Sequence, residues 1–447
     1  MPSLTEYGEM PLVAEHHLPV TLRAYHLLTI AAAPLAPLLL SYRLKRGKEH
    51  ADRLPERLGM SKRVRPQGPL VWMHGASVGE LTAVLPLIRR IRERDFNVLV
   101  TTGTVSSAEL AERRLPPDVT HQFVPLDAPP IVSRFLDRWR PDLALFVESD
   151  LWPNLIIASA SRNIPLILIN GRLSERSFRH WRFVPGTISA LLHHFDLCLA
   201  QSPVNAARYA RLGAPRISTT GNLKLDVPAP PADGEKLAAL KSATAGRIVI
   251  AATSTHPGEE AAVIETHRRL KQSFPGLLTL IAPRHPERGA GIVDIVKIAG
   301  LTAAIRSRGE LPRPSIDIYI ADTLGELGLI YRLSPIVFIG GSLVGHGGQN
   351  PIEAAWLGAA ILHGPHVWNF AEIYAALDTA GGAKLVSDAS KLALSISAWL
   401  QDANARQNVA ETALKAMETL AGALNRTLAA LDPYFMQLRL DRRSDHA

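Results

Sequence analysis

The sequence predicts an α/β protein with two domains, each built on a parallel β-sheet, and three features of the chain support this. Short apolar runs alternate with helix-like patterns, as expected when buried parallel strands are joined by crossover helices. This alternation occurs twice along the 447 residues. Between the two halves the stretch DVPAPPADGEK, residues 226–236, is rich in proline and alanine and lacks a periodic signal, which is typical of an interdomain linker.

Residues 1–42 are predicted to hold a membrane anchor. The chain is strongly apolar from Leu18 to Tyr42, and its cleanest uncharged core runs from Leu27 to Leu40. That core is short for a full span, so a transmembrane helix and a helix lying in the membrane interface are both open. A cleaved signal peptide is disfavoured, because three glutamates precede the apolar run where a basic leader is expected.

A cluster of basic residues follows the apolar stretch. Such a cluster marks the cytoplasmic side of an anchor and attracts anionic lipid headgroups, although a solvated basic helix would look the same. The net charge of +8 would also fit nucleic acid, but these residues crowd beside the anchor and do not mingle with aromatic residues. We therefore expect a membrane surface and no nucleic acid as partner. The cluster comprises Arg43, Lys45, Arg46, Lys48, Arg53, Arg57, Lys62, Arg63 and Arg65.

The two domains are predicted over residues 43–226 and 246–386, with a linker at 227–245. Strands of the first domain are Leu70–Met73, Val98–Val100, Leu143–Val147, Leu166–Ile169 and Leu197–Ala200. Those of the second are Ile248–Ala252, Leu278–Ile281, Ile318–Ile320, Ile336–Ile339 and Ala360–Leu362. Residues 387–447 form an Ala/Leu-rich helical tail, which is expected to pack across the second domain. The pattern indicates two Rossmann-like domains facing one another.

The first strand ends in HGASVGE, residues 74–80, and this loop has two interpretations. Its Gly-x-Ser-x-Gly portion fits the nucleophile elbow of a serine hydrolase, with Ser77 as nucleophile. An α/β-hydrolase places several strands ahead of its elbow, however, whereas here almost nothing but the anchor precedes it. The favoured interpretation is a glycine loop beneath an acceptor, with Glu80 opening the next helix and accepting a proton from an attacking hydroxyl.

Two further polar groups follow strands of the first domain. Glu148 and Asp150 stand close together after the Leu143 strand, and their mutual repulsion favours a functional role for at least one of them. We assign that role to Glu148, and Asp150 or Asn154 to capping the next helix. Lys224 is a candidate cation for a developing negative charge.

The second domain carries a glycine-rich loop after the strand at 335–339. Asn350 is placed to cap the following helix, Pro351 suits its first turn, and Glu353 falls at its third position. Glycines and a free helix N-terminus favour an anionic ligand. Serine, histidine and arginine follow two other strands in the segments that contain Ser254 and Arg284, and they form a good phosphate-binding set that the segment from Asp322 to Leu327 completes.

Several enzyme classes are excluded by the absence of their motifs from the sequence. It contains no Walker loop, no HExxH helix and no G-x-G-x-x-G after the first strand of either domain. The single cysteine, Cys198, lies in an apolar run and is interpreted as a buried small hydrophobe, so neither a disulfide nor a cysteine metal site is expected within one chain.

Eight segments in order resemble the 3-deoxy-D-manno-octulosonic acid (Kdo) transferases of lipopolysaccharide synthesis. They are HGASVGE, ESDLWPNLI, NGRLSERS, GNLKLD, TSTHPGEE, PRHPERG, DTLGELGLIY and GGSLVGHGGQNPIEAA, and the likeness extends from about Arg43 to Phe370. The resemblance implies an inverting GT-B glycosyltransferase that uses no bound metal or other cofactor. It would move Kdo from CMP-Kdo to the lipid A precursor, lipid IVA, at the cytoplasmic face of the bacterial inner membrane.

The resemblance also assigns residues. It implies Glu80 as general base and Glu148 with Lys224 as the pair that stabilises the transition state. It implies contacts to CMP at Pro283, Arg284, Leu324, Gly325, Glu326, Asn350, Pro351, Ile352 and Glu353. The family often carries Glu where Asp150 stands and His where Gln349 stands. The alternative function is another GT-B enzyme, a UDP-sugar transferase or epimerase.

Overall fold

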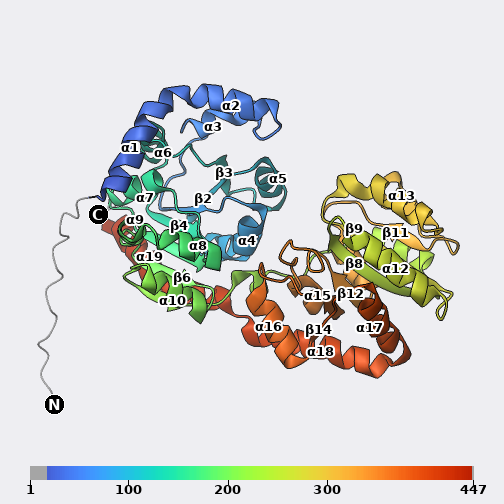
Figure 1. Ribbon diagram of the computed structural model, residues 1–447. Coiled ribbons are helices and arrows are strands. Elements are labelled where there is room, and N and C mark those ends of the chain that lie inside the picture. Colours follow the sequence, from blue (N-terminus) through green and yellow to red (C-terminus); the bar gives the residue numbers. More distant parts are fainter. Residues whose placement is uncertain (1–17, 445–447) are drawn as a thin grey trace, which may run out of the picture. The chain divides into compact units, whose positions relative to one another are not determined.

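The computed structural model describes residues 18–444, which fall into two compact units. Unit 1 comprises the chain up to Val227 and from Gly422 onward, whereas unit 2 comprises Pro228–Ala421. Each unit is built on a seven-stranded sheet with helices on both faces (Figure 1), and every strand pairing is parallel. The predicted α/β class with two parallel sheets is confirmed.

The sheet of unit 1 has the strand order β3-β2-β1-β4-β5-β6-β7. Because the chain runs outward from β1 to one edge and then, from β4, to the other, the carboxyl ends of β1 and β4 form the switch point at which such sheets bind ligands. The strands are β1 (Leu70–His74), β2 (Asn97–Thr102), β3 (Thr120–Phe123), β4 (Leu143–Val147), β5 (Leu166–Gly171), β6 (Leu197–Ala200) and β7 (Ile217–Thr219).

Unit 2 repeats this arrangement with the order β10-β11-β9-β8-β12-β13-β14. Its switch point therefore lies at the carboxyl ends of β8 and β12. The strands are β8 (Ile248–Thr255), β9 (Leu277–Pro283), β10 (Ala303–Ile305), β11 (Ile318–Ile320), β12 (Ile336–Ile339), β13 (Ala360–His363) and β14 (Ala383–Leu385).

The helices connect and cover these strands. Those of unit 1 are α1 (Val20–Ala32), α2 (Ala36–Lys45), α3 (Leu54–Arg57), α4 (Val78–Arg92), α5 (Val105–Arg114), α6 (Pro129–Trp139), α7 (Pro153–Ala160), α8 (Glu175–Trp181), α9 (Pro185–Leu192), α10 (Pro203–Arg211) and α19 (Ala423–Ser444). Those of unit 2 are α11 (Gly234–Ala243), α12 (Glu259–Lys271), α13 (Gly289–Ile298), α14 (Leu327–Leu333), α15 (Ile352–Trp356), α16 (Ala371–Ala380), α17 (Ala389–Gln401) and α18 (Ala403–Leu420). Short 3-10 turns are η1 (Ala33–Leu35), η2 (Ala51–Arg53), η3 (Leu223–Asp226), η4 (Pro286–Arg288) and η5 (Arg306–Arg308).

All ten strands expected from the sequence are present, and the four that the sequence did not reveal are the two edge strands of each sheet. β3, β7, β10 and β14 are three or four residues long. Two of them, β7 and β14, are largely exposed. Edge strands are covered on fewer sides, so they lack the continuous apolar run that identifies an interior strand.

The linker predicted at 227–245 is partly helical, because α11 occupies residues 234–243. The Asp233 side chain accepts a hydrogen bond from the backbone N–H of Lys236 and thereby caps this helix. The prolines before it pack tightly against α14, where a Cβ on Gly328 would lie 2.2 Å from the Pro231 carbonyl oxygen. The proline-rich stretch is thus fixed to unit 2.

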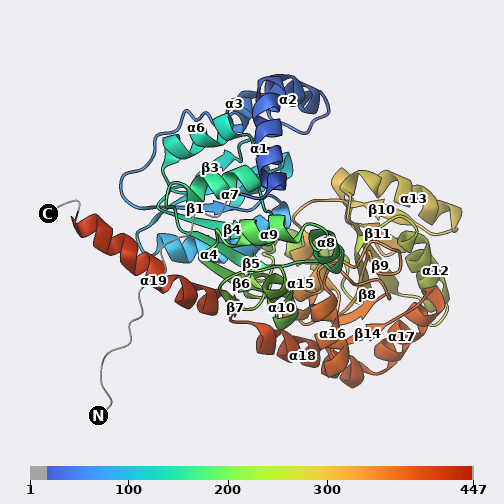
Figure 2. The same ribbon diagram turned by 60° about the vertical axis from the view of Figure 1, so that its left-hand side comes forward.

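The predicted N-terminal anchor is a helix that packs along unit 1. α1, η1 and α2 together form one 26-residue apolar stretch, Val20–Lys45, that is long enough to cross a membrane and is only 11% buried in its most apolar window. α1 lies beside α6 and α7 (Figure 2). One face makes polar contacts with unit 1, in which the Tyr25 hydroxyl donates to Asp127 Oδ2 over 2.9 Å and His26 Nδ1 lies 3.0 Å from Asn154 Oδ1. Residues 1–17 of the predicted anchor lie outside the described part of the chain.

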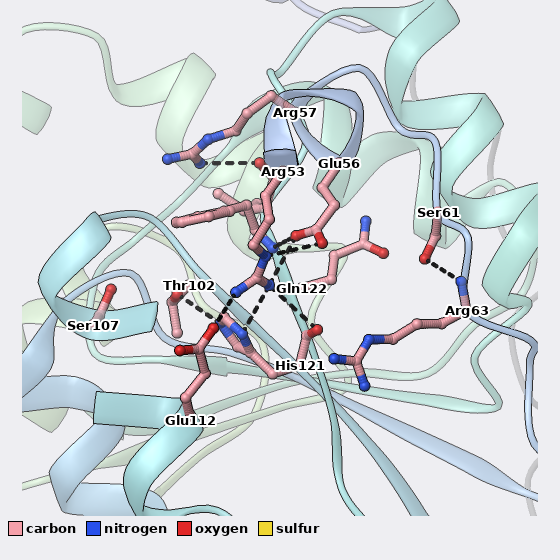
Figure 3. Close-up of polar contacts among 12 residues, drawn as sticks. Arg53, Glu56, Arg57, Ser61, Arg63, Thr102, Ser107, Glu112, His121 and Gln122 are labelled. Carbon is pink, nitrogen blue, oxygen red and sulfur yellow. Dashed lines mark hydrogen bonds and ion pairs between the residues drawn. The ribbon is translucent and has the colours of Figure 1, made fainter. Parts of the chain in front are cut away.

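Part of the basic cluster is structural. Figure 3 shows Arg53 among Glu56, Glu112 and His121, and the pKa of His121 is lowered to about 3 by burial and by nearby arginines. Arg57 is buried together with Glu49, and its Nε donates a hydrogen bond to Glu49 Oε2 over 2.9 Å. Arg43 and Arg65 also form ion pairs. The exposed members are Lys45, Arg46, Lys48, Lys62 and Arg63.

The C-terminal tail does not pack across unit 2 alone, which corrects the expectation for residues 387–447. α17 and α18 belong to unit 2, but α19 returns to unit 1. Asp226 receives the N–H groups of Gly422 and Leu424, both over 2.7 Å, at the start of α19. Phe435 of α19 is 3% exposed, and its ring centroid lies 5.0 Å from that of Phe96. Apolar spacing alone did not show which sheet would receive this helix.

Phe435→Ala is therefore expected to destabilise unit 1 selectively, by about 3 kcal/mol, as is typical for a buried Phe replaced by Ala. Hydrogen exchange should accelerate in β1 and β2 but not in β12 and β13. Met417→Ala, at a fully buried position of α18, is the matched control and should accelerate exchange in unit 2. Acceleration in unit 2 after Phe435→Ala would contradict the placement of α19.

Candidate active site

Glu80 lies in the first turn of α4, directly after the loop that follows β1. The Ser77 side chain caps this helix by accepting the Glu80 N–H. In return, the two oxygens of the Glu80 carboxylate accept hydrogen bonds from the Ala76 N–H, over 2.7 Å, and from Ser77 Oγ, over 3.0 Å. These contacts hold the carboxylate at the switch point. Because a carboxylate accepts about four hydrogen bonds, lone pairs remain for a substrate hydroxyl.

Ser77 does not form a nucleophile elbow. That motif needs a sharp, strained turn at the serine, whereas Ser77 has an extended backbone, with φ −111° and ψ 164°. The neighbouring His74 does not bond to it, because its Nε2 lies 2.9 Å from Asp150 Oδ2. The hydrolase alternative therefore lacks both its backbone geometry and its base.

Glu148 and Lys224 form an ion pair. Glu148 follows β4 directly, Lys224 lies on η3, and Lys224 Nζ donates to Glu148 Oε1 over 2.7 Å. Both side chains are mostly buried, with 19% and 12% exposure for Lys224 and Glu148. The backbone of Glu148 is left-handed, with φ 61°, a conformation that costs a non-glycine residue about 1–3 kcal/mol. Such strain occurs preferentially at functional sites.

Asp150 has a different role from the predicted one. Neither Asp150 nor Asn154 caps α7. The cap is Asp127, whose carboxylate accepts the N–H groups of Asn154 and Leu155 from the preceding loop. Asp150 is instead held by His74, which is fully buried at the end of β1. The spacing along the sequence suggested capping but could not show that a distant aspartate already filled the position.

The surroundings of Glu80 raise the pKa of its carboxyl group. Burial raises the pKa of Glu80, and the negative charges of Glu148 and Asp150 raise it further. For Asp150, burial is outweighed by its hydrogen bonds with His74 and Trp152 and by its electrostatic interaction with His74, so its pKa is lowered. A carboxylate with a raised pKa beside an ion pair is suited to accepting a proton from a hydroxyl.

In unit 2, Ser254, Pro283 and Arg284 lie at the ends of neighbouring strands. Ser254 interrupts the end of β8 with a left-handed backbone, φ 55°. Pro283 ends β9, and Arg284 beyond it has an exposed side chain for which no ion pair is found within residues 18–444. Gly340 is needed beside Ser254, because a Cβ on it would lie 2.6 Å from the Ser254 carbonyl oxygen. Arg284 is therefore placed to meet an anion.

Three amides of the glycine-rich loop after β12, where the sequence favours an anionic ligand, bind a carboxylate within the chain. The N–H groups of Gly341, Ser342 and Leu343 all donate to the carboxylate of Glu259, over 2.6–3.0 Å. Glu259 is fully buried and also accepts the His256 N–H. The nest of amides thus binds a carboxylate of the chain itself. Glu259 had no signal in the sequence, where it looked like an ordinary residue of a first helical turn.

The segment from Asn350 to Glu353 differs in detail from the prediction. The helix that follows, α15, is only five residues long, and Glu353 is its second residue. Asn350 Oδ1 does accept the N–H of Ile352, over 3.0 Å. Burial raises the pKa of Glu353, which a hydrogen bond with Asn350 partly offsets. Tyr374 donates to the carbonyl of Gln349, over 2.8 Å, and fixes the segment before the helix.

The segment Leu324–Glu326 follows β11 and is anchored by its glutamate. Glu326 pairs with Arg306 and with Lys236, whose Nζ lies 2.9 Å from Glu326 Oε1. These contacts, the hydrogen bond with Arg306 above all, lower the pKa of Glu326 to about 2. Gly325 has φ 78° and Leu324 is exposed. Glu326 is thus an anchor of the loop, and Leu324 is its accessible member.

His256 lies in the segment whose serine and histidine were grouped in a phosphate-binding set, but the sequence assigned no individual role to it. Its ring stacks on that of His346 with centroids 4.2 Å apart, and Gln349 Nε2 lies 3.0 Å from His256 Nε2. Burial, followed by the charges of His346, His285 and two arginines, lowers the pKa of His256 to about 4. Its imidazole is therefore neutral and accepts from Gln349. Within residues 18–444, no cluster of three His, Cys, Asp or Glu side chains is arranged to hold a metal ion.

Two solved structures show the class of fold. A glycosyltransferase from Rickettsia africae is 12% identical with a TM-score of 0.57, and the match covers 83% of this chain and 99% of that one. The UDP-GlcNAc 2-epimerase from Neisseria meningitidis, bound to UDP-GlcNAc, is 14% identical with a TM-score of 0.54, covering 80% and 100%. The chain therefore has the GT-B fold.

The sequence relatives define the family within that class. Residues 52–227 match the family model described as 3-deoxy-D-manno-octulosonic-acid transferase. The 3-deoxy-D-manno-octulosonic acid transferase of Haemophilus influenzae is 33% identical over 92% of this chain and 98% of its own length. A probable mitochondrial one from Arabidopsis thaliana is 39% identical over 83% and 86%. This chain belongs to the Kdo transferase family.

Asp150→Asn is expected to move the acid limb of the kcat/KM profile to lower pH. Removing a negative charge near Glu80 lowers the pKa of Glu80, so the ionised form survives to lower pH. Asp142→Asn removes a charge at the opposite end of β1, where Asp142 bonds the Leu70 N–H and Arg65, and should leave the limb in place. A pH–rate series on both variants checks this. An unmoved limb in Asp150→Asn would show that Asp150 does not act on Glu80.

Proposed function

We propose that this Kdo transferase moves Kdo from CMP-Kdo to a hydroxyl of the lipid A precursor, lipid IVA, with Glu80 as general base. The observation that carries the proposal is the position of Glu80 at the switch point, beside the Glu148–Lys224 pair and with a raised pKa. The transfer belongs to lipopolysaccharide synthesis, in keeping with the family.

The proposed reaction is a single displacement. The acceptor O–H proton passes to the Glu80 carboxylate as the hydroxyl oxygen bonds to the anomeric carbon of Kdo. The bond from that carbon to the phosphate oxygen breaks, and CMP leaves with the electron pair. Attack opposite the leaving group inverts the anomeric centre. Lys224, held by Glu148, supplies a positive charge where negative charge develops.

The donor side is proposed to lie at the β8/β12 switch point of unit 2. CMP-Kdo carries a phosphodiester and a carboxylate, and the exposed guanidinium of Arg284, with Ser254 nearby, suits these anions. Glu353 is assigned to the ribose hydroxyls. Because Glu259 takes up the amides of the glycine loop, the anions rely on side chains more than on that loop. We propose no metal for this step.

Glu80→Gln is expected to lower kcat for Kdo transfer to lipid IVA by about 10²–10⁴-fold, the usual contribution of a general base. Binding of CMP, measured by calorimetry, should stay unchanged. The hydrolase alternative predicts the reverse pattern, in which Ser77→Ala abolishes activity. Under our proposal Ser77→Ala removes only the helix cap and one hydrogen bond to Glu80, so it should lower kcat far less than Glu80→Gln does.

The same assay separates the remaining alternatives. Transfer by the wild type with full activity in Glu80→Gln would remove Glu80 as base. A wild type that binds UDP more tightly than CMP would favour the UDP-sugar alternative. A wild type that binds CMP but transfers nothing to lipid IVA would leave the donor assignment standing with another acceptor.

We further propose that α1 and α2 lie in the interface of the bacterial inner membrane, at its cytoplasmic face, and do not span it. A spanning helix would carry its contact with Asp127 into hydrocarbon, which is unfavourable for a carboxylate. The other side of the helix exposes leucines, among them Leu28 at 69% and Leu38 at 70%. The exposed Lys45, Arg46 and Lys48 follow directly and suit anionic headgroups.

Leu28→Glu/Leu38→Glu is expected to weaken binding to vesicles of phosphatidylethanolamine and phosphatidylglycerol by at least about tenfold, since two apolar side chains no longer enter the interface. Sedimentation with vesicles measures this. Leu394→Glu, at a similarly exposed leucine of α17, is the control. Alkaline carbonate should release the wild type from membranes, whereas resistance to extraction would indicate a spanning helix.

A further inference from the structure

We propose that Tyr209 and Asn170 are positioning residues that hold the Glu148–Lys224 ion pair in its catalytic arrangement. The inference rests on the proposed role of that pair. Glu148 follows β4 and Asn170 lies near the end of β5, the neighbouring strand of unit 1, and both have a left-handed backbone, with φ 61° and 53°. Non-glycine residues keep such a conformation only where the surroundings enforce it. The contacts that hold these two backbones therefore indicate which local geometry the fold maintains.

Tyr209 fixes the backbone of Glu148. Its hydroxyl, on the fully buried side chain from α10, donates to the Glu148 carbonyl oxygen over 3.1 Å. On the other side, the Glu148 N–H donates to the Ile169 carbonyl over 3.0 Å. Gly171 makes room for the ring, because a Cβ there would lie 3.1 Å from Tyr209 Cε2. The same hydroxyl also lies 3.5 Å from the Arg172 carbonyl oxygen, so its shorter contact is the one to the backbone of Glu148.

Asn170 fixes the other partner. Its Oδ1 accepts the N–H of Leu223 over 3.0 Å, at the start of the short turn η3 that carries Lys224. Its own carbonyl accepts from Gln201 Nε2 over 3.1 Å. Asn170 is completely buried, and its Nδ2 has no hydrogen-bond partner among the described residues, 18–444. An apolar residue would pack at lower cost, so the contact to η3 is what retains the amide.

The contacts of Tyr209 and Asn170 both maintain the distance between the charged groups of Glu148 and Lys224. Lys224 Nζ and Glu148 Oε1 are 2.7 Å apart, and the attraction between two charges weakens as they separate. If the Glu148 carbonyl were released, its backbone could relax to negative φ and turn the carboxylate away from Lys224. If η3 were released, Lys224 would move instead. Either change leaves the positive charge poorly placed for the leaving group.

The first test is Tyr209→Phe, which removes one hydroxyl and keeps the ring. We expect kcat for Kdo transfer to fall by about tenfold or more while KM for CMP-Kdo stays unchanged, because the donor-binding residues lie in unit 2. Asn170→Gly loses the amide but still allows the left-handed backbone. Asn170→Ala loses the amide and also disfavours that backbone, so it should lower kcat more than Asn170→Gly does. Ser334→Ala, which loses a buried hydroxyl-to-carbonyl hydrogen bond in unit 2, is the control and should leave kcat unchanged.

A double-mutant cycle separates positioning from general stability. If Tyr209 acts through Glu148, Tyr209→Phe should cost nothing further in a Glu148→Gln background. Multiplicative losses in the double variant, or a wild-type kcat in Tyr209→Phe, would overturn the inference. Thermal unfolding of each variant identifies any that fail to fold.

A readout independent of the reaction distinguishes this inference from the proposed function. Acetylation of Lys224 by an amine reagent, followed by mass spectrometry, should accelerate several-fold in Tyr209→Phe and Asn170→Ala, toward the rate in Glu148→Gln. Lys271, paired with Asp317 in unit 2, reports the background rate. Unchanged labelling of Lys224 in both variants would refute the positioning role. A wild type that transfers no Kdo would refute the proposed function instead.

Discussion

The site depends on one topological constraint, which is that each sheet extends in both directions from its first strand. In unit 1 the chain leaves β1 toward β3 and returns past it to β4, and in unit 2 it leaves β8 toward β10 and returns to β12. Crossovers on either side of the switch point therefore run toward opposite edges of the sheet, and sheets of this type bind their ligands at that point. Glu80 and Glu148 follow β1 and β4, while Ser254 lies at the end of β8 and the glycine loop follows β12. One topological rule thus determines where both sets of polar groups lie.

Both switch points contain residues that are unfavourable on their own, either because the backbone is left-handed or because a charge is buried. Glu148 in unit 1 and Ser254 in unit 2 have left-handed backbones. Glu259 is a buried charge that is tolerated because four backbone N–H groups surround it. In the same way, we propose that Tyr209 holds the left-handed backbone of Glu148. Strain and burial are balanced locally, so these loops have defined shapes before any ligand arrives, and a preorganised loop need not pay for ordering during the reaction.

The sequence predicted the features that local residue patterns encode. It did not reveal the features that depend on contacts between residues far apart in the chain. Interior strands have continuous apolar runs and were predicted, whereas the edge strands β3, β7, β10 and β14 lack them. Glycines marked the loop after β12, but nothing in the order of residues revealed that Glu259 fills its amides. Asp150 looked like a cap because Asp127, more than twenty residues earlier, could not be seen to hold α7. The destination of α19 was hidden for the same reason, since its apolar face fits either sheet.

The contacts of α1 link the membrane proposal to the chemistry. His26 and Tyr25 of α1 meet Asn154 and Asp127, and Asp127 caps α7 at Asn154 and Leu155. α7 begins five residues after Glu148. A helix that lies in the interface would therefore hold the loop after β4 at a set height above the lipid. Under the proposed function, a hydroxyl of the lipid acceptor must reach Glu80, so the position of this loop relative to the lipid would affect transfer. The polar face of α1 would then contribute to orientation as well as to attachment, which a freely tethered anchor could not do.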